Sequence, residues 1–297
     1  MRALILYYSI SNNTKWLGIK AQEALTSKSW ESDIFHLRDF NSKKYPYNPD
    51  LIILGVPVHY WDIPNPAIEK IRSLPRFNET AAFVFSSFGR CVCNSVPFLL
   101  AKELVEKNCR ILGGGQIVSP HSAKVEGGQR LGDLEMEFGK GQPNDIALGE
   151  FVSVIKRLAE EIETNKAVQI DLKELKKLHT KGIVASLMSY LTSDRQRMRS
   201  MPHIEYAKEN CEYCYKCIKS CDAGAIKCTS LKEIVINKKM CNKCYKCTDI
   251  CPSGALTTNW NKVIFGTKVI HIFAKDVTTK FVPLAVKDAA VTCDSHY

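Results

Sequence analysis

The chain has 297 residues, 45% of them hydrophobic and 24% charged, and carries a formal net charge of +10. This ordinary globular composition excludes a collagenous, coiled-coil or largely disordered protein, and the length predicts two domains. No run of 18 apolar residues occurs, and the short apolar start lacks a signal-peptide cleavage site. We therefore expect a cytoplasmic protein without a transmembrane segment.

Apolar runs alternate with helical patterns up to residue 163. Strands are predicted, in chain order, over 2–8, 31–37, 50–56, 80–87 and 109–119, and helices over 16–25, 65–74, 95–108 and 145–163. Parallel strands need such crossover helices, and strands without strict polar alternation fit burial on both faces. The sequence thus predicts an α/β domain over 1–165 with a doubly wound, five-stranded parallel sheet.

The composition changes after residue 165. Residues 166–204 are predicted to form a basic helical linker, with an amphipathic stripe over 171–191 that would dock two domains together. The alternative is a partner-binding or membrane-surface patch around its arginines, Arg195, Arg197 and Arg199. No period marks 261–297, which we leave as an unassigned C-terminal tail.

Cysteine is concentrated in one segment, since nine of the 13 cysteines lie between residues 211 and 251. Without a secretory signal, such clustering favours metal binding over disulfides. The pattern C-x2-C-x2-C-x3-C occurs twice, first as Cys211, Cys214, Cys217 and Cys221 and then as Cys241, Cys244, Cys247 and Cys251. Three cysteines in one tight turn suit three corners of a cubane [4Fe–4S] cluster, whereas structural zinc usually takes two separated pairs.

Residues 205–260 resemble a bacterial-type two-cluster ferredoxin, a small α+β domain. The second motif continues as CPSGAL, as in that family, whereas the first continues with Asp222 where Pro is usual. The resemblance implies that the fourth cysteine of each motif binds the other cluster. Cys251 would then complete the cluster of Cys211, Cys214 and Cys217, and Cys221 that of Cys241, Cys244 and Cys247. Cys228 lies outside both motifs, and we expect it to be buried as a small apolar residue.

The segment SISNNT, which follows the first predicted strand, resembles the phosphate loop of flavodoxins, [ST]-x-[ST]-G-x-T, with Asn12 in place of Gly. A loop between a strand and a helix offers backbone amides and the positive helix end to a phosphate. Asn also adopts left-handed conformations more readily than most residues. The alternative is an ordinary turn and helix cap. The resemblance implies that the FMN phosphate is bound by Ser9, Ser11, Asn12, Asn13 and Thr14.

Two later loops are similar to the ring-contacting loops of flavodoxin-like domains. Both leave the carboxyl ends of predicted strands, where open α/β sheets bind ligands. The candidate residues are Pro57, Val58, His59, Tyr60 and Trp61 in the first loop and Ser87, Phe88, Gly89 and Arg90 in the second. Buried loop aromatics and a plain surface arginine are the alternatives. A third loop, 119–133, has Ser119 where related domains carry Met, and we expect Cys91 and Cys93 to be inert thiols.

In this order the two resemblances are those of flavodoxin-ferredoxin fusion proteins. They imply an iron-sulfur flavoprotein with one FMN and two [4Fe–4S] clusters, which carries electrons between these groups and to or from a redox protein. One alternative is an FMN-dependent oxidoreductase acting on a quinone, an electrophile or a flavin. Another is a redox-sensing regulator. The chain contains no GxGxxG motif, which would indicate a nicotinamide-binding domain. Despite the positive net charge, it also contains no motif typical of nucleic-acid recognition.

Overall fold

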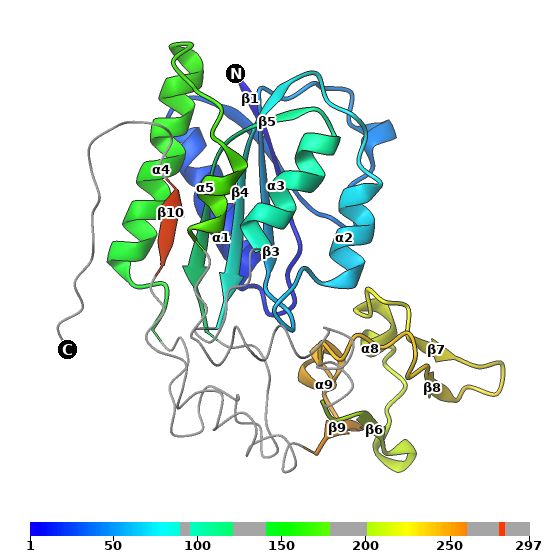
Figure 1. Ribbon diagram of the computed structural model, residues 1–297. Coiled ribbons are helices and arrows are strands. Elements are labelled where there is room, and N and C mark those ends of the chain that lie inside the picture. The colour runs from blue at the N-terminus through cyan, green and yellow to red at the C-terminus, as the bar shows by residue number, and fades with distance from the viewer. Residues whose placement is uncertain (90–95, 121–140, 179–200, 260–278, 283–297) are drawn as a thin grey trace.

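The computed structural model describes residues 1–89, 96–120, 141–178, 201–259 and 279–282. A large α/β unit is followed by a smaller unit formed by residues 201–259, which we call the cysteine-rich unit (Figure 1). In chain order the elements are β1 (Arg2–Tyr7), α1 (Asn13–Thr26), β2 (Glu31–His36), the 3-10 helix η1 (Ser42–Lys44), β3 (Leu51–Pro57), α2 (Asn65–Arg72), β4 (Thr80–Phe88), α3 (Val96–Glu106), β5 (Cys109–Val118), α4 (Asp145–Glu163), α5 (Leu172–Lys176), β6 (Ile204–Tyr206), the 3-10 helix η3 (Lys208–Asn210), α8 (Lys216–Lys219), β7 (Ile226–Cys228), β8 (Ile234–Ile236), α9 (Lys246–Asp249), β9 (Leu256–Thr258) and β10 (Lys280–Val282).

The main sheet has the strand order β10-β5-β4-β3-β1-β2, and β1 to β5 are all parallel. Ile5 at the centre of β1 pairs with Ile34 of β2 on one side and with Ile53 of β3 on the other. The order 2-1-3-4-5 of the parallel strands is the flavodoxin-like one. The predicted fold class is therefore confirmed, and we call this part the flavodoxin-like unit.

Helices cover both faces of this sheet (Figure 1). Alternate residues of β1 point to opposite sides, so that Leu4 and Leu6 pack in a core with α2, α3 and α5, whereas Ala3 and Ile5 pack in a second core with α1 and α4. All four side chains are fully buried. The continuous apolar runs of the sequence follow from this burial on two faces.

The GGG run of β5 makes room for two segments that sequence analysis left outside the first domain. A Cβ atom on Gly114 would lie 2.7 Å from Leu175 Cδ2, and one on Gly115 would lie 2.4 Å from Phe281 Cδ1. Helix α5 thus packs on the flavodoxin-like unit, and β10 from the tail joins its sheet antiparallel to β5. The described part of the expected docking stripe is consequently core of this unit, and its remainder lies outside the described residues.

Replacing either of two glycines by alanine tests this packing, because the two changes are expected to alter the stability of the protein in opposite directions. Gly55→Ala should destabilise the protein by about 2 kcal/mol through overpacking, because the new methyl would lie 2.1 Å from Phe85 Cζ. Gly149→Ala should stabilise it by about 0.5–1 kcal/mol through helix propensity, because a Cβ atom at this position of α4 would meet no described residue within 4 Å outside its own helix turn. Denaturant unfolding followed by circular dichroism measures both, and equal midpoints would contradict the packing described.

The cysteine-rich unit is built from two short antiparallel strand pairs, β6 with β9 and β7 with β8. Its core contains Ile204, Ile226, Ile234 and Leu256, and five cysteines of the two motifs pack against it. Tight turns separate the elements, with Tyr215 before α8 and Tyr245 before α9 both in the left-handed region. The unit therefore has the α+β character expected from the sequence. Among the described residues, no helix is both long and apolar enough to cross a membrane.

Candidate functional site

The loops that follow β1, β3 and β4 leave one edge of the sheet, and this edge faces the cysteine-rich unit (Figure 1). These are the carboxyl ends of parallel strands, the usual position of ligands in open α/β sheets. The structure therefore brings the candidate flavin loops and the cysteine motifs to the same region of the molecule.

The loop after β1 has the form expected of a phosphate-binding loop. Asn12 adopts a φ of 70°, the left-handed conformation for which Gly is usual, and α1 begins at Asn13. The buried hydroxyls of Thr14 and Ser87 are 2.8 Å apart, and Asn13 Nδ2 donates to the carbonyl of Pro120 at 2.8 Å. These contacts join the start of α1 to the end of β4 and to the loop after β5.

One hydroxyl of this loop lacks a hydrogen-bond partner in the part of the chain that the structure describes. Ser9 is 5% exposed, and its Oγ makes no hydrogen bond among the described residues. A buried hydroxyl without a partner carries a desolvation cost that a bound acceptor removes. Together with the amides at the start of a 14-residue helix, it fits the phosphate of FMN.

The loop after β3 forms a tight turn. Val58 N donates to Ser87 O at 2.8 Å, and His59 and Asp62 exchange two backbone hydrogen bonds of 2.9 and 3.1 Å. Between them, Tyr60 and Trp61 both have positive φ, 51° and 70°. Bulky residues occupy this region only when the surroundings impose it, and such strain clusters at functional sites.

Tyr60 reaches the cysteine-rich unit. Its hydroxyl donates to the backbone carbonyl of Lys243, between Cys241 and Cys244, at 2.9 Å. Burial raises the pKa of Tyr60 well above its usual value, so the phenol keeps the proton that it donates. Sequence analysis had assigned Tyr60 to the flavin ring and gave no sign of this contact. Its ring lies 4.2 Å from that of His59, centroid to centroid.

Four cysteines line one cavity of the cysteine-rich unit, about 360 Å³ in volume including its open mouth. They are Cys211, Cys214 and Cys217 of the first motif with Cys251 of the second. Among the described residues no three His, Cys, Asp or Glu side chains converge on a single metal ion. A cubane does not need such convergence, because each thiolate binds a different iron. The cavity and its thiols therefore fit a [4Fe–4S] cluster, with the fourth ligand from the other motif.

The remaining motif cysteines form a second group. Cys221 of the first motif interacts electrostatically with Cys241, Cys244 and Cys247 of the second. The backbone N–H of Ala225 lies 3.3 Å from Cys221 Sγ, a donor of the kind that tunes cluster potentials. Cys228, which was expected to be buried, is exposed on β7, so this expectation was wrong. Cys228 pairs with Ile234 at the last position of a three-residue strand, next to the exposed loop of the hairpin, where little of the unit covers it.

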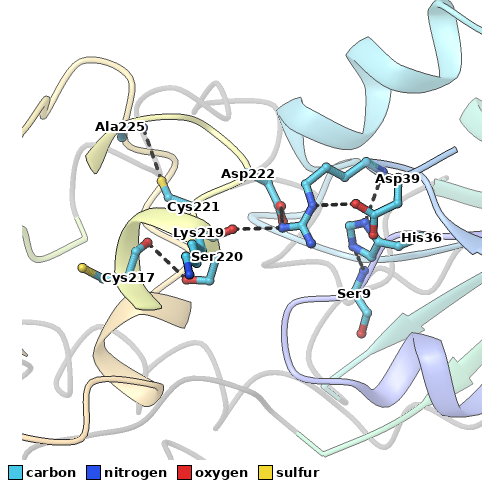
Figure 2. A network of polar contacts seen from close by, with 10 residues as sticks. Ser9, His36, Asp39, Cys217, Lys219, Ser220, Cys221, Asp222 and Ala225 are labelled. Atoms are coloured by element: carbon cyan, nitrogen blue, oxygen red, sulfur yellow. Dashed lines mark hydrogen bonds and ion pairs between the residues drawn. The ribbon is translucent and has the colours of Figure 1, made fainter. Parts of the chain in front are cut away.

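A polar network joins the first motif to the loop after β2 (Figure 2). Asp222, directly after Cys221, accepts a hydrogen bond from Arg38 Nη1 at 2.7 Å, and only 5% of its side chain is exposed. Arg38 Nη1 also lies 3.4 Å from the carbonyl oxygen of Lys219. Asp222, which stands where the ferredoxins that this segment resembles have Pro, thus provides one half of an ion pair between the two units.

The network continues to the candidate phosphate loop through His36. Its Nδ1 lies 3.1 Å from Arg38 N and its Nε2 lies 3.4 Å from Ser9 N (Figure 2). Burial lowers the pKa of His36, so the ring is neutral near pH 7 and accepts a hydrogen bond from one of these two backbone N–H groups, at the nitrogen that carries no proton. Sequence analysis missed both Arg38 and His36, which belong to no motif.

The predicted positions of the loops after β4 and β5 fall partly outside the described residues. Gly89 ends the described part of the loop after β4, and Phe88 is buried beside Val118. Arg90, Cys91, Cys93 and the loop beyond Pro120 lie outside the described residues. Of the candidate flavin residues, the structure therefore brings together those of the loops after β1 and β3 with Ser87 and Phe88 at the end of β4 and Gly89 directly after it.

Comparisons with known proteins give three results. The family of 4Fe-4S binding domains matches residues 233–256, which include the whole second motif. No curated protein matches the chain. The solved structures with similarity include a flavodoxin from the domain Archaea, with 18% identity, a TM-score of 0.42, and coverage of 55% of this chain and 99% of that one. A Streptococcus pneumonia flavodoxin has 13% identity, a TM-score of 0.38, and coverage of 56% and 99%.

A third similar structure is the rubredoxin oxygen:oxidoreductase from the anaerobe Desulfovibrio gigas, with 13% identity and a TM-score of 0.42. The match covers 56% of this chain and 37% of that chain. The strand order and the family match together show a flavodoxin-like unit followed by a 4Fe-4S binding domain.

Proposed function

We propose that this protein is an electron-transfer iron-sulfur flavoprotein, with FMN on the flavodoxin-like unit and two [4Fe–4S] clusters on the cysteine-rich unit. One observation carries the proposal: the Tyr60 turn of a candidate flavin loop touches the backbone between Cys241 and Cys244. FMN exchanges electrons singly or in pairs and a [4Fe–4S] cluster exchanges them one at a time, so the combination connects one- and two-electron chemistry.

The two groups of cysteines take different positions in this proposal. Cys221, Cys241, Cys244 and Cys247 hold what we call the inner cluster, because Tyr60 and Arg38 of the flavodoxin-like unit contact the chain beside these residues. Cys211, Cys214, Cys217 and Cys251 hold the outer cluster, and Cys214 is exposed. Electrons then pass between flavin and partner through two clusters in series.

The flavin loops have separate tasks. Ser9, Ser11, Asn12, Asn13 and Thr14 bind the phosphate, and the positive end of α1 compensates part of its charge. Pro57, Val58, His59 and Trp61, with Ser87, Phe88 and Gly89, surround the ring. Tyr60 and the ion pair of Arg38 with Asp222 hold the inner cysteines against this edge of the sheet.

Breaking the ion pair tests the proposal in the full chain. Arg38→Glu places two carboxylates together, and we expect it to slow electron transfer from photoreduced flavin to the clusters by about tenfold, because the tethered units must then find each other again. Transient absorption measures this rate, which should not depend on protein concentration in either form. Iron and flavin contents should stay unchanged.

Two further variants make the result specific. Arg76→Glu reverses an exposed arginine in the loop before β4, at the opposite edge of the sheet, and should leave the rate unchanged. The exchanged pair, Arg38→Asp with Asp222→Arg, should recover most of the lost rate. Equal rates for Arg38→Glu and Arg76→Glu would contradict the docking. Absence of any flavin-to-cluster transfer would contradict the function itself.

A further inference from the structure

We propose that the β7–β8 hairpin is the docking surface for a small acidic electron-carrier protein. This inference rests on the proposed function, because it names the class of partner that the outer cluster serves. The surface consists of two lysines and two apolar residues, Lys227, Leu231, Lys232 and Val235, and we call it the hairpin surface.

Its apolar residues are unusually exposed. Leu231 at the hairpin tip is 81% exposed and Val235 is 48% exposed. Lys227 and Val235 are register partners across the hairpin, so their side chains share one face. Leaving Leu and Val in water has a free-energy cost that a partner's surface would remove.

Positive charge predominates in the hairpin and the residues that follow it. Lys227, Lys232, Lys238 and Lys239 are all exposed, and the acid of this stretch, Glu233, is paired with Lys208 at 2.7 Å. Opposite charge on a partner accelerates encounter, and a small apolar centre with a charged rim is typical of a weak, short-lived complex. Such a surface fits an acidic protein rather than a basic one.

The hairpin also lies beside the outer cysteines. Ile234, on the inner face of β8, lines the cavity together with Cys214 and Cys251. The hairpin extends sideways from the cysteine-rich unit, to the right in Figure 1, and its tip points away from the flavodoxin-like unit. A protein seated there would approach the outer cluster site without disturbing the contacts of Tyr60 and Arg38.

Binding can be measured separately from electron transfer. The holoprotein is titrated by calorimetry with an oxidised, small acidic two-cluster ferredoxin, and we expect binding at low ionic strength that weakens as salt rises. The double variant Lys227→Glu with Lys232→Glu should weaken it by about tenfold, since each exposed pair contributes modestly. The double variant Leu231→Ser with Val235→Ser should weaken it without changing the salt dependence.

The control makes the same charge change elsewhere. Lys44→Glu with Lys102→Glu reverses two exposed lysines of the flavodoxin-like unit and should leave the affinity unchanged. Equal weakening by both charge variants, or absence of ferredoxin binding, would overturn the docking surface. Self-association that the hairpin variants abolish would assign the surface to a second copy and also overturn it.

Failure of the proposed function is distinguishable from failure of this inference. If photoreduced flavin does not reduce the clusters, the function fails even where ferredoxin binding shows the expected dependence on the hairpin. If electrons pass from the flavin to the clusters but the hairpin variants bind ferredoxin as the unchanged protein does, the proposed function is supported and the docking surface is wrong.

Discussion

Cys251→Ala is expected to remove the outer cluster, which is built mainly from the first motif, and to leave the cluster of its own motif in place. The reason is geometric, because Cys251 lines the cavity of Cys211, Cys214 and Cys217. About half of the protein-bound iron should be lost if each cluster contributes equally. Electron paramagnetic resonance of the reduced protein should then show one cluster signal without the splitting that two neighbouring clusters produce.

The reciprocal variant identifies which signal is lost. Cys221→Ala should remove the inner cluster, so the two variants should retain different cluster signals. Cys228→Ala is the matched control, because this exposed cysteine lies between the motifs and outside both groups. Retention of the same signal in Cys251→Ala and Cys221→Ala would show that the assignment across motifs is wrong.

Ser11→Glu is expected to abolish flavin binding while the clusters remain. A carboxylate placed in the half-buried loop between β1 and α1 would repel the phosphate in an environment that screens charge poorly. We expect the affinity for FMN to fall by more than about a hundredfold, or 2.7 kcal/mol. Quenching of flavin fluorescence during titration of flavin-free protein measures the affinity.

Ser11→Gln is the matched control, since it has the shape of the glutamate without the charge and should weaken binding far less. Chromatography of the flavin extracted from the unchanged protein should give FMN rather than FAD, because a single phosphate loop was found. Equal affinities for Ser11→Glu and Ser11→Gln would show that the phosphate does not bind in this loop. Extraction of FAD would contradict the cofactor assignment.

Local patterns in the sequence determined the parallel strands, the cluster ligands and part of the phosphate loop. Four of the five parallel strands, β1, β3, β4 and β5, are apolar over most of their length because both of their faces are buried, whereas the edge strand β2 has only Ile34 and Phe35 as apolar residues. The cysteine spacing is equally local, since three ligands in one turn must be close in sequence. Asn12 could be expected in a left-handed conformation from residue type and position, and it has a φ of 70°.

Tertiary structure alone decided how the two units meet. Arg38 and Asp222 are 184 positions apart, and each by itself is an ordinary charged residue. The three residues of β10 are too few to show a period, and they became a strand because β5 offered an unpaired edge with glycines beneath Phe281. Tyr60 was assigned to the flavin because its loop resembled a ring-contacting loop. Its hydroxyl contacts Lys243 because the fold brings that loop and the second cysteine motif to the same edge, and no local pattern encodes such an approach.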